Sequence, residues 1–511
     1  MSRVTRAGAL LAASLLLTAT ACDSEPSEDS GPRAGSSGAT EKSSATPGTP
    51  QGDALPEALT GQRVKWSSCE PQGWTCADVT VPVDYRKPDG ETMNIALIRK
   101  ESAAKKPIGS LLFNFGGPGG SGVEILPRAA SQYGKLAERY DLVSFDPRGV
   151  AKSDGVRCRS DAEMEKAASV DLTPDTPAEE KAYFADATAF GKGCEKGAGT
   201  LLPHLTTTNT ARDMDLIRHL LGDEKMHYFG MSYGTELGGT YAHLFPQNVG
   251  RITLDAVVDP TADTFDHALN QTLGFQRALD NYLKANGKDP KKGTQEIVDL
   301  LERIDEKPLR TTDGRRLNDS LALTGIVLPL YSQSSWPSLT AALRQAEAGD
   351  GSGLIQLADA YNERDSSGKY STQSHSQRAI SCADDKQRPT PEEAEARLGE
   401  FRKTSPVFGE FLGWDVAGWC ADWPVEGEHQ DADVSAEGSA PILVVGTTGD
   451  PATPYEGARK MADELGKGVG VLLTNKGEGH GAYGSATCAT AAIDAYFLDG
   501  KTPEDGTTCE S

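Results

Sequence analysis

Short apolar runs alternate with amphipathic, helix-like segments through much of the chain. Four of these runs, at 108–114, 226–229, 441–446 and 469–474, lead directly into turns rich in Gly, Pro, Asn or Thr. Short apolar runs that end in such turns are typical of buried strands, and strands that alternate with helices predict a parallel sheet covered by helices. The pattern therefore predicts an α/β fold with a mostly parallel central sheet.

The stretch between the strand-like runs at 251–255 and 441–446 has a different, helical periodicity. Apolar positions recur at helical spacing in three of its segments, 275–283, 294–301 and 353–361. We predict that residues 261–425 form a helical cap inserted after the sixth strand. The sheet-forming part would then consist of residues 58–260 and 426–511.

The run at 226–229 continues into a Gly-x-Ser-x-Gly pattern formed by Gly230, Ser232 and Gly234 and then into a helix-like segment. This order predicts a nucleophile elbow, a tight turn in which flanking glycines let strand and helix approach closely. Alone, five residues in a chain with 55 glycines are weak grounds. The strand and helix on either side make Ser232 the candidate nucleophile.

A serine nucleophile needs a histidine base and a carboxylate that orients it. The chain has 8 histidines, and His480 follows the strand-like run at 469–474, whereas Asp450 follows the run at 441–446. The order Ser, Asp, His along the chain is the one expected with this elbow. We therefore predict a triad of Ser232, Asp450 and His480.

The glycine-rich loop at 115–122, which follows the run at 108–114, is suited to bind the oxyanion formed in acyl transfer. It lacks both the Lys-Ser/Thr ending of a phosphate-binding loop and the spacing of a dinucleotide-binding loop. We expect the backbone N–H groups of Gly117 and Tyr233 to form the oxyanion hole.

These motifs, together with Asp-Pro-Arg-Gly at 146–149, resemble those of α/β-hydrolases in the proline iminopeptidase and tripeptidyl aminopeptidase family. The resemblance covers most of the chain from about Leu59 onward, at 116–119, 146–149, 230–234, 450–454 and 479–481. Phe115 stands where proline iminopeptidases have a histidine, and Ala151 where a second glycine is usual. The first departure favours the secreted, tripeptidyl aminopeptidase-like branch. We interpret Asp146 and Arg148 as structural residues of their turn.

The resemblance implies a serine exopeptidase that releases short peptides, with tripeptides expected, from peptide substrates with a free N-terminus. It implies no cofactor, and we expect a monomer. Glu124, Asp259 and Asp266 are candidate acceptors for the substrate ammonium group. The alternatives are a carboxylic-ester or lactone hydrolase with the same triad and, from another class, a non-catalytic surface binding protein on a hydrolase scaffold.

Residues 1–21 have two arginines before an apolar run too short to span a membrane, which predicts a signal peptide. The segment ends in Ala-Thr-Ala-Cys, similar to a bacterial lipoprotein cleavage site, so we predict lipidation of Cys22. Plain secretion is the alternative. Residues 22–57 are polar and rich in Ser, Gly and Pro, which predicts a disordered tether. The protein would then be extracytoplasmic, anchored by lipid to the outer face of the cell membrane.

Eight cysteines are left when Cys22 is set aside, an even number consistent with disulfides in an oxidising compartment. Spacing does not fix their connectivity, and we predict pairing of neighbours: Cys69–Cys76, Cys158–Cys194, Cys382–Cys420 and Cys488–Cys509. The sequence contains no metal-binding motif, so we predict no metal site. A net charge of −23 argues against binding to nucleic acid or to anionic lipid headgroups.

Overall fold

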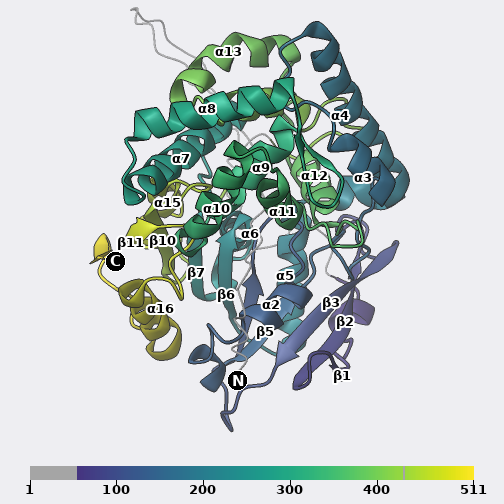
Figure 1. Ribbon diagram of the computed structural model, residues 1–511. Coiled ribbons are helices and arrows are strands. Elements are labelled where there is room, and N and C mark those ends of the chain that lie inside the picture. Colours follow the sequence, from purple (N-terminus) through teal and green to yellow (C-terminus); the bar gives the residue numbers. More distant parts are fainter. Residues whose placement is uncertain (1–54, 430–431, 511) are drawn as a thin grey trace, which may run out of the picture.

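A ten-stranded sheet runs through the computed structural model, which describes residues 55–429 and 432–510 (Figure 1). The predicted signal peptide, Cys22 and almost all of the predicted tether lie outside the described residues. The strands follow the spatial order β1-β2-β3-β5-β4-β6-β7-β10-β11-β12. Their bounds are β1 (Ser67–Cys69), β2 (Trp74–Pro82), β3 (Thr92–Lys100), β4 (Ser110–Asn114), β5 (Asp141–Phe145), β6 (Met226–Ser232), β7 (Val249–Val257), β10 (Ile442–Gly449), β11 (Gly470–Glu478) and β12 (Thr507–Glu510).

The sheet is parallel from β5 to β12, and antiparallel only where β1, β2 and β3 extend it. The predicted mostly parallel α/β fold is confirmed. The strand that we expected to be the sixth is β7, because the short strand β1 adds one more at the start.

Helices cover both faces of the sheet, and the alternation of side chains along each strand explains the two layers. In β10, Ile442 and Val444 pack into the apolar core beneath α5, α6 and α15. Leu443 and Val445 point the other way, into the core shared with α2 and α16. The bounds of these helices, and of the other described α-helices outside the chain between β7 and β10, are α1 (Glu57–Thr60), α2 (Gly122–Ala129), α3 (Asp161–Ala167), α4 (Pro177–Ala198), α5 (Thr207–Leu221), α6 (Tyr233–Leu244), α15 (Tyr455–Glu464) and α16 (Thr487–Asp499).

The chain between β7 and β10 is mainly helical and lies above the sheet in Figure 1. We call its helices α7 to α14 the cap helices. Apolar side chains of most of these helices, among them Phe275, Leu300 and Leu412, form a core of their own, whereas Ile380 of α12 packs into the core of the sheet. The bounds are α7 (Thr264–Ala285), α8 (Pro290–Glu306), β8 (Leu309–Arg310), β9 (Arg316–Leu317), α9 (Asp319–Leu330), α10 (Trp336–Glu347), α11 (Ser352–Tyr361), α12 (Gln373–Asp384), α13 (Pro391–Thr404) and α14 (Gly409–Gly418).

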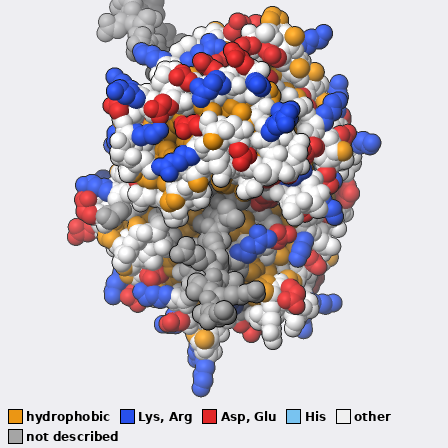
Figure 2. Space-filling model, viewed as in Figure 1, with side chains coloured by type: hydrophobic (Ala, Val, Ile, Leu, Met, Phe, Trp, Pro, Cys, Tyr) orange, Lys and Arg blue, Asp and Glu red, His pale blue; other side chains and the backbone are white. Residues whose placement is uncertain are grey.

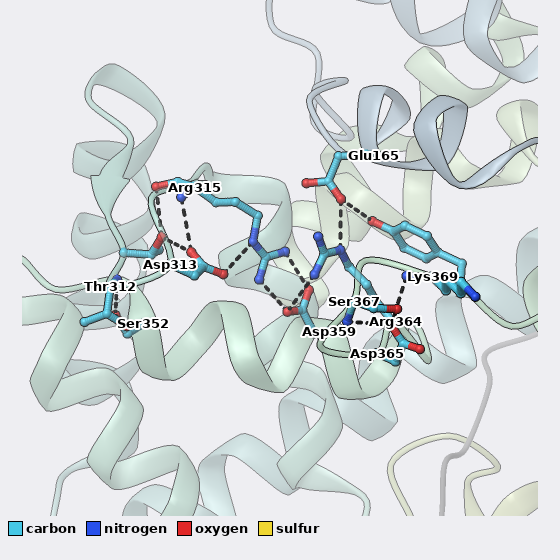
Figure 3. Close-up of polar contacts among 12 residues, drawn as sticks. Glu165, Thr312, Asp313, Arg315, Ser352, Asp359, Arg364, Asp365, Ser367 and Lys369 are labelled. Atoms are coloured by element: carbon cyan, nitrogen blue, oxygen red, sulfur yellow. Dashed lines mark hydrogen bonds and ion pairs between the residues drawn. The ribbon is translucent and has the colours of Figure 1, made fainter.

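Helices α3 and α4, from the chain between β5 and β6, also lie beside the cap helices. Tyr183 of α4 shares a small apolar cluster with Leu398 and Trp414 of the cap helices. Figure 3 shows a chain of ion pairs between α11 and α3: Asp359 of α11 pairs with Arg315 and, at 3.7 Å, with Arg364, and Arg364 donates to Glu165 of α3 at 2.9 Å. Helices α3 and α4 therefore help to hold the cap helices in position.

All four predicted disulfides are present: Cys69–Cys76, Cys158–Cys194, Cys382–Cys420 and Cys488–Cys509. Four disulfides indicate an extracytoplasmic protein, because cytosolic thiols are kept reduced. Within the described ranges, no helix combines the length and the apolar character needed to cross a membrane. On the face shown in Figure 2, acidic and basic side chains are interspersed.

Candidate active site

Ser232 lies at the end of β6, in the strained turn that the glycine pattern predicts. Its backbone angles are φ 55° and ψ −128°, and the helix α6 starts at the next residue. A Cβ atom on Gly230 would lie 2.2 Å from the carbonyl oxygen of Gly234, and one on Gly234 would lie 2.6 Å from that of Asn114. Both flanking positions therefore require glycine, and the turn presents the Ser232 side chain at the end of the sheet.

Strand register brings the other predicted residues to the same end of the sheet. Asn114 of β4 pairs with Gly230 of β6, so the glycine-rich loop starts beside the elbow. Gly449 of β10 pairs with Glu478 of β11, so the loops that carry Asp450 and His480 leave the sheet side by side. Functional residues at the carboxyl ends of parallel strands are the general arrangement in such sheets.

His480 and Asp450 form a buried hydrogen-bonded pair. The His480 Nδ1 atom lies 2.9 and 3.0 Å from the two carboxylate oxygens of Asp450. Because an ionised carboxylate can only accept, Nδ1 carries the proton and donates it. The neutral ring then presents Nε2 as an acceptor, and this atom is buried without a hydrogen-bond partner among the described residues. His480 is therefore prepared to accept a proton at Nε2.

The charges around His480 favour its protonated form. Burial lowers the pKa of the imidazole, but the charge and hydrogen bond of Asp450 and the charge of Asp255 together raise it more, so the pKa lies above its ordinary value. Asp450 is itself held by the backbone amides of Ala452 and Thr453, at 3.0 and 2.9 Å, and by the Thr453 hydroxyl. These donors stabilise the carboxylate that would face the imidazolium.

Two residues that the sequence did not single out fix the loop of His480. Asp255, at the end of β7, accepts hydrogen bonds from the amides of Ala482 and Tyr483 at 2.9 to 3.0 Å. Burial raises the pKa of Asp255 to about 6, although these amides lower it. The carbonyl oxygen of Tyr331 accepts a hydrogen bond from the His480 amide at 2.8 Å, and the Tyr331 ring meets the imidazole edge-on, with the ring centroids 5.3 Å apart. An aspartate near the end of an apolar strand could have indicated Asp255 from the sequence. No local sequence feature indicates the role of Tyr331.

The glycine-rich loop passes directly beside the elbow. A Cβ atom on Gly116 would lie 2.7 Å from Ser232 Cβ and 3.2 Å from the Tyr233 amide nitrogen. Asp146 accepts the Ser121 hydroxyl at 2.7 Å and the Val123 amide at 3.1 Å, which ties the start of α2 to the 146–149 turn. These contacts agree with a structural role for Asp146 and hold the loop against the nucleophile.

Ser232 and His480 line one cavity of about 300 Å³, and Gly117 contributes to its wall. The cap side of the wall is rich in serines: Ser332, Ser334, Ser335 and Ser338. A wider groove of about 700 Å³ over β2 and β3 contains neither Ser232 nor His480.

None of the three candidate ammonium acceptors lines this cavity within the described chain. Glu124 is half exposed and bonds Arg128 at 2.9 Å, and Asp259 bonds Lys460 at 2.8 Å. Asp266 lies in the first turn of α7. The cavity wall instead includes Glu478, which precedes His480 by two residues and which the sequence did not suggest.

One group of side chains away from the cavity has donor types that can hold a metal. Ligand atoms of Asp384, Glu428 and His429 lie within 4.8 Å of one another. Asp384, however, already accepts the amide and the hydroxyl of Thr207, each at 2.7 Å. We assign no metal to this group.

The chain is similar in sequence to known proteins over most of its length. Residues 405–509 match a family described as TAP-like protein. The chain is 38% identical over 488 residues to the serine protease Hip1 of Mycobacterium tuberculosis. This match covers 89% of this chain and 92% of that protein. It is 30% identical over 478 residues to the tripeptidyl aminopeptidase of Streptomyces lividans, covering 87% and 86%. A third relative, carboxylesterase B of M. tuberculosis, is 32% identical over 504 residues, covering 92% and 94%. The chain belongs to the tripeptidyl aminopeptidase-like family of α/β-hydrolases.

Proposed function

We propose that the protein is a serine exopeptidase that removes short peptides, with tripeptides expected, from free amino termini outside the cytoplasm. The observation that carries this proposal is the buried, unpartnered Nε2 atom of His480, which lines the same cavity as Ser232. The orientation of His480 by Asp450 supports the triad predicted from the sequence. The names of the Hip1 and Streptomyces relatives support peptides as the substrate.

In the proposed mechanism, His480 Nε2 takes the proton of the Ser232 hydroxyl as its oxygen attacks the substrate carbonyl. The Gly117 and Tyr233 amides donate hydrogen bonds to the oxyanion, and Asp450 stabilises the imidazolium. His480 then gives the proton to the leaving amine. Water, deprotonated by the same imidazole, hydrolyses the acyl-enzyme and frees Ser232.

The serine-rich part of the cavity wall supports a peptide rather than a purely apolar acyl chain. Hydroxyl groups on this wall can bond the amides of a peptide, although those of Ser332 and Ser334 also bond each other at 2.8 Å. The carboxylesterase relative keeps ester hydrolysis as the second candidate. A cavity that contains both Ser232 and His480 argues against a binding protein with a blocked site.

The deciding experiment offers chromogenic amides of one, two and three residues, with free and with acetylated amino termini, beside a simple ester. We expect the free tripeptide amide to be cleaved fastest and Ser232→Ala to lose at least about 10³-fold in kcat. The variant should unfold at the same denaturant concentration as the wild type. Equal cleavage of free and acetylated amides would contradict the aminopeptidase proposal, and an active Ser232→Ala variant would contradict the mechanism.

We also propose that a diacylglyceryl group on Cys22 anchors the protein to the outer face of the cell membrane. The proposal rests on the signal-like segment 1–21 and on the small residues before Cys22. The disulfides support the compartment, because they require an oxidising environment.

A further inference from the structure

Glu478 is the one carboxylate among the described residues that line the cavity with Ser232 and His480, and no Lys or Arg lines it. It is the last residue of β11, two positions before His480. The sequence near His480 therefore places a single negative charge in the wall of the proposed substrate site.

The two oxygens of Glu478 have different surroundings. Oε1 accepts a hydrogen bond from Asn281 Nδ2 of α7 at 2.9 Å. Oε2 is buried and has no hydrogen-bond partner in the described part of the chain. A buried carboxylate oxygen without a donor is costly, so this atom is suited to receive a donor from a ligand.

No cation of the described chain forms an ion pair with Glu478. The charges of Lys284 and Arg277 act on Glu478 without a direct ion pair, and Arg277 donates instead to the carbonyl oxygen of Thr448 and to the carboxylate of Glu456, both at 3.2 Å. Burial raises the pKa of Glu478, and the Asn281 hydrogen bond and the charges of Lys284 and Arg277 lower it by less. A bound cation would complete the site, because it supplies both the missing donor and the missing charge.

We propose that Glu478 binds the N-terminal ammonium group of the peptide substrate. This inference rests on the proposed aminopeptidase function and names the residue that would distinguish free from blocked amino termini. An ammonium group has three donors, so it can bond Oε2 of Glu478 and still reach hydroxyls of the serine-rich wall.

The test compares kcat/KM for a free tripeptide amide with that for its N-acetylated form. Glu478→Gln keeps an oxygen for Asn281 and removes the charge. Loss of a charge-assisted hydrogen bond should lower the free-to-acetylated ratio by about 10- to 100-fold, mainly through a higher KM for the free peptide.

Two further variants separate charge from structure. Asn281→Ala removes the contact to α7 but keeps the carboxylate, so the ratio should stay within about threefold of the wild type. Glu456→Gln removes a half-exposed carboxylate, bonded to Arg277, that does not line the cavity, and it should also keep the ratio.

An unchanged ratio in Glu478→Gln would overturn the assignment of Glu478 and leave the aminopeptidase function intact. An equal loss of the ratio in Asn281→Ala would also overturn it, because the effect would then follow the packing of α7. A wild-type protein that does not prefer the free peptide would instead refute the proposed function itself. If Glu478→Gln fails to fold, as seen in its circular dichroism, Glu478→Asp provides the second variant. Glu478→Asp retains the charge and should keep the preference for the free peptide. Loss of that preference in a folded Glu478→Asp variant would overturn the proposal.

Discussion

Removing the carboxylate of Asp213 should destabilise the protein strongly without changing its chemistry. Arg148 and Asp213 are fully buried and bond each other at 2.7 and 2.8 Å. The remaining guanidinium donors bond the backbone carbonyl oxygens of Pro82, Val83 and His204. Asp213→Asn would leave the Arg148 charge buried without a counter-charge, which costs about 3–5 kcal/mol.

That loss is a large part of the 5–15 kcal/mol typical of a folded domain, so it should be plain in urea unfolding followed by circular dichroism. The control is Glu124→Gln, which breaks the half-exposed ion pair with Arg128 and should change the free energy of unfolding by about 0.5 kcal/mol or less. Folded Asp213→Asn should keep the wild-type kcat. A variant as stable as the wild type would refute the energetic reasoning, and a folded but inactive one would refute the structural interpretation of Arg148.

Two further predictions concern the pH profile and the N-terminus. His480 must be neutral to act as a base and its pKa is raised, so kcat/KM should increase with pH through a midpoint above about 6.5. Asp255→Asn removes a charge that raises this pKa and should therefore move the midpoint to lower pH. A midpoint that does not move would contradict this electrostatic account. Cys22→Ser should release the protein from the membrane fraction into the medium while a Cys382→Ser variant stays bound, and a wild-type protein whose N-terminal peptide carries no lipid by mass spectrometry would rule the anchor out.

The elements that could be predicted from sequence are those with local signals. Ser232 lies between glycines that its turn requires, and Asp450 and His480 each follow a short apolar strand. The disulfides join cysteines that are neighbours in sequence, between 7 and 38 residues apart. Each of these features depends on a few consecutive residues or on the order of residues along the chain, so the sequence alone can indicate it.

The contacts that shape the site depend on tertiary structure and could not be predicted in this way. Tyr331 holds the His480 loop through its backbone carbonyl, a group that every residue has. Glu124 and Asp259 were reasonable acceptors from their places in the sequence, but Arg128 and Lys460 already bond them. Glu478 can be recognised as a candidate substrate-binding residue only from the structure, which shows that it lines the same cavity as Ser232.

The hydrogen bond from the His480 amide to the Tyr331 carbonyl has a consequence for engineering this enzyme family. Tyr331 belongs to the segment between β7 and β10, so exchanging that whole segment between relatives would replace a support of the imidazole together with the substrate-facing wall. In a chimaera made in this way, a change in activity could come either from altered selectivity or from a displaced His480, and the two causes could not be separated. Single substitutions among Ser334, Ser335 and Ser338 leave that support in place, and they are the cleaner route to a changed preference.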